Sequence, residues 1–147
     1  MLKGISPLLS PDLLYAIARM GHGDEMVLAD ANFPAESIAA STGCEIVRAD
    51  GLSVTEILDA MLPLFPIDTY NGTPLFMMAA VPGDTLDPAL ERDYRTTFDK
   101  HGADWAKIDR IERFAFYDRA TSSFLIVQTG ETRKYANLLL RKGVVCP

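Results

Sequence analysis

Helix-start signals alternate with short apolar segments along this chain, and that alternation limits the folds open to it. Ser10-Pro11-Asp12 puts a capping serine before a proline at the first helical position. Residues 53–56 form a capping box, and Asp87 caps a third helix. Strands that alternate with helices favour a layered α/β sheet. The apolar segments that we predict as strands are residues 25–29, 45–48, 74–81, 108–117 and 124–129.

Four segments carry more specific local predictions. Gly21 should end the first helix in the manner of a C-terminal glycine. The fully apolar run at residues 74–81 is the best candidate for a central strand buried on both faces. Alternating apolar residues place Arg113 within a strand, and a turn follows at residues 118–120. Residues 135–141 suit a helix or a strand, and we favour a strand.

Length, composition and charge set the class of protein. The 147 residues fit one domain, residues 1–147, and the hydrophobic content of 48% is somewhat high for a monomer, which favours a subunit interface. The net charge of −6 argues against nucleic acid and anionic membranes as partners. No secretory signal or membrane-length apolar run occurs. Cys44 and Cys146 do not make a disulfide framework, so we expect free thiols and a cytoplasmic location.

Several classes of chemistry lack their sequence signals. Two histidines and two cysteines, widely spread, have no metal-ligand spacing, so we expect no metal site. The glycine-rich patterns of dinucleotide and P-loop sites are missing, as is the G-x-S-x-G pattern of a serine nucleophile. Cys44 follows the pattern of a small core residue. Non-covalent acid–base chemistry without a cofactor remains.

His22 is the leading acid–base candidate. It lies between Gly21 and Gly23 in a turn that precedes an apolar strand, and the ordinary pKa of histidine, about 6.5, lies near neutrality. The alternative is a histidine that only hydrogen-bonds its own turn. The second histidine, His101, precedes a glycine at a helix end, where a cation favours the helix dipole, and we interpret it as structural.

Polar residues near strand ends are candidates for ligand binding. Asp30, Asp50 and Asp84 each lie near turn residues at an apparent strand end. Ligands bind beyond the carboxyl ends of strands in open α/β sheets, and Asp30 and Asp50 fit that position. Either residue could instead cap the next element. Tyr135 and Asn137 follow a glycine turn, and a phenol with a neutral amide suits a hydroxyl-rich neutral ligand. Arg113 should pair with a carboxylate or point into a polar cleft.

Taken together, six segments in one order resemble the ribose-pyranase and fucose-mutarotase family. They are residues 20–25, 29–34, 48–51, 68–70, 112–117 and 135–137, and the likeness extends over residues 2–143. The Arg113 segment and residues 68–70 are more similar to the L-fucose mutarotase branch than to the ribose branch.

This resemblance implies an enzyme that interconverts the α and β anomers of a free sugar without a cofactor. It also implies a three-layer α/β/α, Rossmann-like subunit with a mostly parallel sheet, assembled into a ring-shaped homo-oligomer, a decamer. The family's proton donor matches His22. Its sugar-binding residues match Asp30, Asp68, Arg113, Tyr135 and Asn137.

Mutarotation needs one proton placed on the ring oxygen and one removed from the anomeric hydroxyl, so one histidine suffices. L-Fucose is the expected sugar; the alternatives are a D-ribose pyranase and a non-catalytic sugar-binding accessory of transport. If the chain is extended from His22 to Asp30, these residues lie about 26 Å apart. One sugar cannot touch both, so either the turn folds back or the site lies between subunits. We predict a site between subunits.

Overall fold

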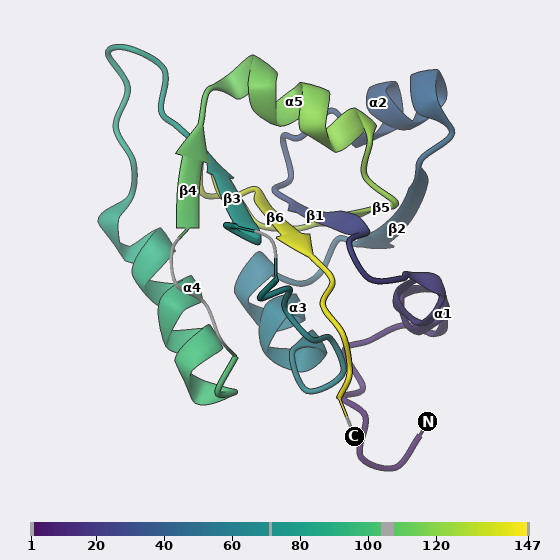
Figure 1. The fold of residues 1–147 in the computed structure, drawn as a ribbon. Coiled ribbons are helices and arrows are strands. Elements are labelled where there is room, and N and C mark those ends of the chain that lie inside the picture. The colour runs from purple at the N-terminus through teal and green to yellow at the C-terminus, as the bar shows by residue number, and fades with distance from the viewer. Residues whose placement is uncertain (1, 71, 104–107, 147) are drawn as a thin grey trace.

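The computed structural model describes residues 2–70, 72–103 and 108–146, and there the chain forms a mixed six-stranded sheet with helices on both faces (Figure 1). The strand order is β2-β5-β1-β6-β3-β4. The strands are β1 Glu25–Ala29, β2 Glu45–Ala49, β3 Leu75–Met78, β4 Ile108–Ile111, β5 Leu125–Thr129 and β6 Leu138–Arg141. The helices are α1 Pro11–Arg19, α2 Ala35–Thr42, α3 Val54–Met61, α4 Pro88–Lys100 and α5 Arg113–Thr121.

Alternate residues of β1 divide the core into two apolar layers. Met26 and Leu28 pack with residues of α1, α3 and α4, whereas Val27 and Ala29 pack with residues of α2 and α5. Figure 1 shows these two groups of helices on opposite sides of the sheet. Because successive side chains of a strand point to opposite faces, a strand covered on both sides is apolar throughout. The predicted three-layer α/β/α sandwich is confirmed.

Strand β6 is antiparallel to both of the strands with which it pairs. β1 and β2 pair in parallel with β5, and β3 pairs in parallel with β4, whereas β6 is antiparallel to both β1 and β3. The carboxyl end of β6 therefore lies beside the amino end of β1, where Arg141 is opposite Glu25. The amino end of β6 lies beside the carboxyl end of β1, where Leu138 is opposite Leu28.

The three predicted helix starts are confirmed, and each has the expected polar contact. The Oγ atom of Ser10 accepts a hydrogen bond from Leu13 N (3.1 Å) at the start of α1. Ser53 and Glu56 form the complete capping box of α3. Asp87 accepts a hydrogen bond from the second residue of α4, which begins at a proline. Caps of this kind satisfy the backbone N–H groups that a first turn leaves without partners.

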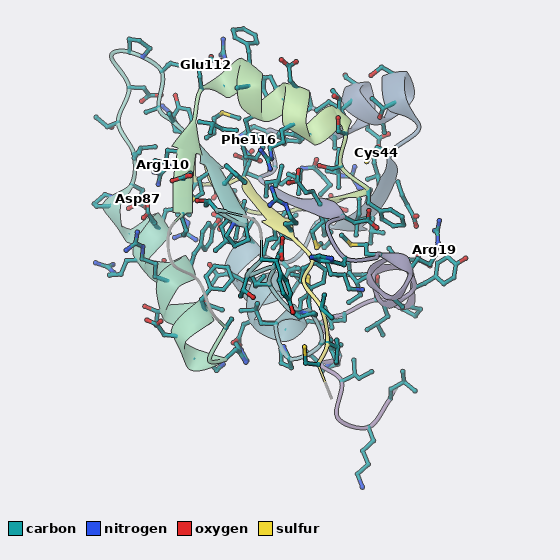
Figure 2. The ribbon with its side chains drawn as sticks, in the orientation of Figure 1. Arg19, Cys44, Asp87, Arg110, Glu112 and Phe116 are labelled. Carbon is teal, nitrogen blue, oxygen red and sulfur yellow. The ribbon has the colours of Figure 1, made fainter. Side chains whose placement is uncertain are left out.

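The predicted strand at residues 108–117 is wrong beyond Ile111. Arg113 is the first residue of α5, and the predicted turn at residues 118–120 lies inside that helix. The cause is Glu112, whose carboxylate accepts hydrogen bonds from Phe114 N (2.8 Å) and Ala115 N (3.2 Å) and so caps the helix. Figure 2 shows Glu112 at the start of α5 and Phe116 on the side of the helix toward the sheet.

Of the remaining local predictions, one was wrong and one was correct only in part. Gly21 does not end α1: the helix stops at Arg19, and Met20 is extended, with φ −62° and ψ 136°. Gly21 N instead donates to the Asp24 carboxylate (2.7 Å) and closes the following turn. The apolar run at residues 74–81 does form a strand covered on both faces, β3, with Leu75 and Met77 in one apolar layer and Met78 in the other, but it is shorter than predicted and is the fifth strand in the sheet order, not a central one. The preferred strand at residues 135–141 is confirmed for β6.

Gly143→Ala tests how closely the end of the chain passes Asp68. A Cβ atom at Gly143 would lie 2.6 Å from the Ile67 carbonyl oxygen and 3.0 Å from Asp68 Cα. Because backbone atoms cannot rotate away, we expect a loss of about 1–3 kcal/mol in the free energy of unfolding in urea. Gly51→Ala is the control, since its Cβ would have no neighbour within 4 Å and should change stability by less than about 0.5 kcal/mol. Equal losses would contradict the expected crowding.

Candidate functional site

The sheet divides the predicted site residues between two opposite ends of β1. His22 precedes this strand and Asp30 follows it. Because β6 is antiparallel to β1, Asn137 lies at the Asp30 end and Arg141 lies at the His22 end. We call the first group the Asp30 cluster (Asp30, Arg113, Tyr135 and Asn137) and the second the His22 cluster (His22 and Asp68).

Asp30 and Asn137 form a reciprocal pair in the Asp30 cluster. The Asn137 amide oxygen accepts from Asp30 N (2.8 Å), and the amide nitrogen donates to Asp30 Oδ2 (2.9 Å). Asn32 N donates to the other carboxyl oxygen (2.9 Å), and the Gln128 amide donates to the Asp30 carbonyl (2.6 Å). The Asp30 carboxyl is therefore held in one orientation, in a residue that is only 4% exposed.

Burial raises the pKa of Asp30 above its ordinary value of 3.8. Removal from water disfavours the charged form, and the negative charge of Glu131 acts in the same direction. Hydrogen bonds from the backbone around it and from the Asn137 side chain lower the pKa but do not compensate for burial. This carboxyl therefore holds its proton to a higher pH than a carboxyl in water.

A cavity of about 210 Å³ opens beside this pair. Its size suits a small ligand, since pockets for drug-sized ligands are larger, at roughly 300–1,000 Å³. All four residues of the Asp30 cluster line it. The complete lining is Asp30, Asn32, Phe33, Met78, Arg113, Tyr117, Lys134, Tyr135 and Asn137.

Two residues that line this cavity are in energetically unfavourable states: Arg113 has a buried donor without an acceptor among the described residues, and Tyr135 has a strained backbone. The Nε atom of Arg113 is buried and makes no hydrogen bond to any residue that the structure describes. A buried donor without an acceptor is costly, and a small movement of the side chain that brought this atom onto a ligand oxygen would relieve that cost. Tyr135 has φ +59°, in the left-handed region that side chains other than glycine rarely adopt. Such backbone strain costs about 1–3 kcal/mol and concentrates at functional sites.

His22 projects from a tight turn at the other end of the sheet. Gly23 has φ +87° and donates its N–H to the Lys142 carbonyl (2.9 Å), which fixes the turn against the end of the chain. Nε2 of His22 lies 3.3 Å from Asp68 Oδ1. No residue in the described parts of the chain hydrogen-bonds the other ring nitrogen, and the side chain is 43% exposed. One nitrogen is thus held by a carboxylate while the ring remains accessible.

Asp68 is built to remain ionised behind His22. Its side chain is fully buried, and burial alone would raise its pKa. Tyr70 N (3.0 Å) and His22 donate hydrogen bonds to this carboxylate, and His22 and Arg141, the latter at 3.8 Å, add positive charge. Together these interactions outweigh burial and lower the pKa of Asp68 below 3.8. An ionised carboxylate can orient an imidazole and stabilise its protonated form. Asp68, predicted to bind sugar, therefore contacts the candidate proton donor.

Other candidates from the sequence lie outside both clusters. His101 is the C-cap residue of α4 and hydrogen-bonds Asp59 (2.7 Å), which confirms a structural role. Asp50 forms an ion pair with Arg48. The Cys44 thiol is half-buried and donates to the Ser123 carbonyl (3.1 Å). Among residues 2–70, 72–103 and 108–146, no three His, Cys, Asp or Glu side chains are grouped so as to hold a metal ion, and no helix could span a membrane.

Sequence reasoning did not assign a role to several residues that lie beside the two clusters. Phe33 and Lys134 line the cavity, and their nearness in sequence to Asp30 and Tyr135 was the available signal. Tyr117 comes from α5 and ends the motif segment 112–117, whereas Met78 comes from β3, and no local pattern connects it to the cavity. The ring of Tyr70 lies edge-on to His22, with 5.7 Å between the ring centroids.

Comparison with known proteins identifies the family. A sequence model of the RbsD / FucU transport protein family matches residues 3–145. This chain belongs to that family. It is 51% identical over 144 residues to the L-fucose mutarotases of Actinobacillus pleuropneumoniae serotype 5b (strain L20) and Histophilus somni (strain 2336), which covers 98% of this chain and 97% of each relative.

Solved structures agree with this assignment. The fucose mutarotase of Streptococcus pneumoniae, crystallised with L-fucose, superimposes with a TM-score of 0.91 at 43% identity, over 99% of this chain and all of that one. Bacillus subtilis RbsD, complexed with D-ribose, is 18% identical and shares the fold with a TM-score of 0.76, over 99% of this chain and all of that one. The greater likeness to the fucose branch, expected from residues 68–70 and 112–117, is confirmed.

Asp30→Asn tests the effect of burial on this carboxyl. Because its pKa is raised in the fold, the native state binds the proton more tightly than the unfolded chain, and ionised Asp30 costs stability as pH rises above about 4. The substituted amide stays neutral, so the free energy of unfolding of the variant should rise relative to wild type with increasing pH. Urea unfolding from about pH 4 to pH 7 measures this difference.

Asp84→Asn is the control for this pH series. The pKa of Asp84 is lowered, chiefly by a hydrogen bond from Tyr135, so its contribution is lost only as pH falls below about 4. Its difference from wild type should stay constant over the same pH range. A constant difference for Asp30→Asn as well would show that burial does not raise the pKa of Asp30.

Proposed function

We propose that this protein is a mutarotase that interconverts the α and β anomers of a free monosaccharide, and that its substrate is L-fucose. The observation that carries the proposal is the near-complete match, at 51% identity, to proteins named L-fucose mutarotase. The geometry supports it independently. A histidine held by a buried carboxylate can transfer protons, and the small polar cavity offers donors and acceptors to hydroxyl groups.

The reaction needs no group beyond these side chains. The ring oxygen gains a proton as the anomeric hydroxyl loses one, the bond between the anomeric carbon and the ring oxygen breaks, and an aldehyde forms. Rotation about the adjacent carbon–carbon bond and the reverse proton transfers close the ring on the other face. We assign the proton transfer to His22, oriented by Asp68. A positioned acid–base group contributes roughly 10²–10⁴-fold to such a step.

The Asp30 cluster is assigned to sugar recognition. Asp30 and Asn137 present carboxyl and amide groups, and Arg113 presents an N–H donor without a protein acceptor among the described residues. These groups fit an uncharged sugar. A sugar phosphate would call for several cations or a helix N-terminus at the phosphate.

We further infer that one site combines the His22 cluster of one subunit with the Asp30 cluster of a neighbour in a ring-shaped homo-oligomer. Within one chain the clusters lie at opposite ends of β1, whose five residues span roughly 16 Å, and His22 lies in the turn before that strand. Each cluster also carries an exposed aromatic side chain. Tyr70 is 66% exposed beside His22, and Phe114 is 61% exposed beside Arg113. Exposed aromatic side chains of this kind suit a subunit interface.

We place this activity in the cytoplasm. The free cysteines Cys44 and Cys146 support that location, since thiols persist in a reducing compartment.

His22→Gln tests the assigned proton transfer. Saturation-transfer NMR on L-fucose, D-ribose and D-galactose measures the rate of anomer exchange with and without protein. Wild type should accelerate exchange, most strongly for L-fucose, and the variant should lose roughly 10²–10⁴-fold of that acceleration while it still binds the sugar. Unchanged exchange in the variant would exclude His22 as the acid–base group. A wild type that binds L-fucose without accelerating exchange would make the protein a sugar-binding accessory, and a preference for ribose would make it a pyranase.

Mixed oligomers test the shared site. His22→Gln and Asp30→Ala subunits should each be inactive alone. If every site takes one cluster from each of two chains, some sites in the mixed oligomer combine the intact His22 cluster of an Asp30→Ala subunit with the intact Asp30 cluster of a His22→Gln subunit. With equal amounts of the two subunits and random assembly, about one quarter of the sites are restored in this way. The activity of the purified mixed oligomer measures this restoration.

The matched control for the mixed oligomer combines His22→Gln with Asp68→Ala. Both substitutions damage the same cluster, so each site in that mixture has a damaged His22 cluster and activity should stay absent. Equal activity in the two mixtures would contradict a site made from two chains.

A further inference from the structure

A carboxylate outside the cavity contacts the strained tyrosine that lines it. The Tyr135 hydroxyl donates to Asp84 Oδ2 (2.8 Å), and the Lys134 ammonium lies 3.3 Å from both oxygens of the same carboxylate. Asp84 belongs to the loop between β3 and α4 and is not part of the cavity lining. The motif segments of the family resemblance, residues 68–70 and 112–117 among them, do not include it.

We propose that Asp84 is a positioning residue that fixes the Tyr135 phenol so that its oxygen acts toward the sugar as a hydrogen-bond acceptor. This inference rests on the proposed function of the cavity. A phenol has one O–H proton to donate. Because that proton is engaged by Asp84, the lone pairs of the phenol oxygen remain for the ligand. A sugar hydroxyl that contacts Tyr135 must then donate its own proton.

Asp84 is held in a conformation that suits this role. Thr85 N donates to its Oδ1 (2.8 Å), and its own N–H donates to the Val81 carbonyl (3.0 Å) across a turn that contains Gly83 at φ +88°. The Tyr135 hydrogen bond, the Thr85 N–H and Lys134 lower the pKa of Asp84. The group is therefore a carboxylate near neutral pH, and a carboxylate can only accept hydrogen bonds. The direction of the Tyr135–Asp84 bond has no alternative.

The consequence is a directional arrangement of donors and acceptors in the cavity. Arg113 has N–H groups and can only donate to a ligand, whereas the oxygen of Tyr135 can only accept from one. Without Asp84, the phenol could turn its proton toward the sugar and accept or donate equally well. The carboxylate removes that freedom, and it also restrains a residue whose backbone is strained at φ +59°.

A double-mutant cycle tests this coupling in the full-length protein. KM, kcat and the Kd for L-fucose are measured for wild type, Asp84→Ala, Tyr135→Phe and the double variant. Asp84→Ala should raise KM and Kd about five- to tenfold with a smaller change in kcat, as expected for the loss of one oriented hydrogen bond. In the Tyr135→Phe background the same substitution should change both constants less than about twofold, because the hydroxyl on which Asp84 acts is gone. An equal rise in both backgrounds would overturn the proposal, as would no rise in either.

Two further variants separate positioning from damage to the fold. Asp84→Asn keeps an amide oxygen that can accept the phenol proton, so it should restore KM to within about threefold of wild type. Asp118→Ala, an exposed aspartate on α5, should keep the wild-type KM. A KM for Asp84→Asn as high as that of Asp84→Ala would contradict positioning through an accepted hydrogen bond.

A panel of monofluorinated fucoses, one for each hydroxyl position, tests the polarity without changing Asp84. Fluorine cannot donate, so at one position the Kd for wild type should rise about five- to tenfold, and Tyr135→Phe should abolish that rise. If no position behaves in this way, Tyr135 is not an obligatory acceptor. If wild type binds L-fucose without accelerating anomer exchange, the proposed activity is contradicted but the role of Asp84 is not. The double-mutant cycle and the fluorinated sugars then still test that role, because both can be measured as changes in Kd.

Discussion

The antiparallel pairing of β6 with β1 is the interaction on which the rest of the site depends. It returns the end of the chain to its beginning, with Leu138 opposite Leu28 and Arg141 opposite Glu25. The same register brings Asn137 onto the Asp30 carboxyl, 107 residues away in sequence. At the other end it brings Arg141 within 3.8 Å of Asp68. One reversed strand in an otherwise parallel arrangement thus supplies a polar partner to both clusters.

The two key carboxyls are the same chemical group in opposite environments. Asp30 is buried among amide and backbone dipoles near another carboxylate, Glu131, and its pKa is raised. Asp68 is equally hidden from solvent, but His22 and Arg141 provide positive charge, and its pKa is lowered. Nearby positive charge therefore lowers the pKa of Asp68, whereas Asp30 has no such partner among the described residues and burial raises its pKa. A carboxylate that stays ionised near neutral pH, as Asp68 does, suits a partner for imidazole, whereas Asp30 suits a group that exchanges hydrogen bonds with hydroxyls.

Local signals in the sequence were sufficient for much of the fold and for naming the site residues. Capping patterns located α1, α3 and α4, and apolar runs located β1 and β5. Arg113 was assigned to a strand because the spacing of the apolar residues around it imitates a strand. The helix signal that was overlooked is Glu112, whose carboxylate caps α5. Motif resemblance named His22, Asp68, Asp30 and Asn137, but not which of these residues contact one another. The contact of Asn137 with Asp30 depends on the reversal of β6, which no local pattern indicates. The sequence placed Asp84 near a strand end but did not connect it to the site, since its links to Tyr135 and Lys134 are side-chain contacts made 51 and 50 residues away.

The proposed division of the site between the two ends of a strand would link catalysis to assembly. In the proposed arrangement, the rigid β1 strand holds proton transfer at one end and sugar recognition at the other, so a subunit alone has two halves of different sites. The neighbouring subunit must then set the distance between His22 and the sugar. A displacement of about 1 Å can cost two orders of magnitude in rate. Substitutions at the exposed Tyr70 and Phe114 should therefore lower the rate by changing how subunits meet, although neither group transfers a proton.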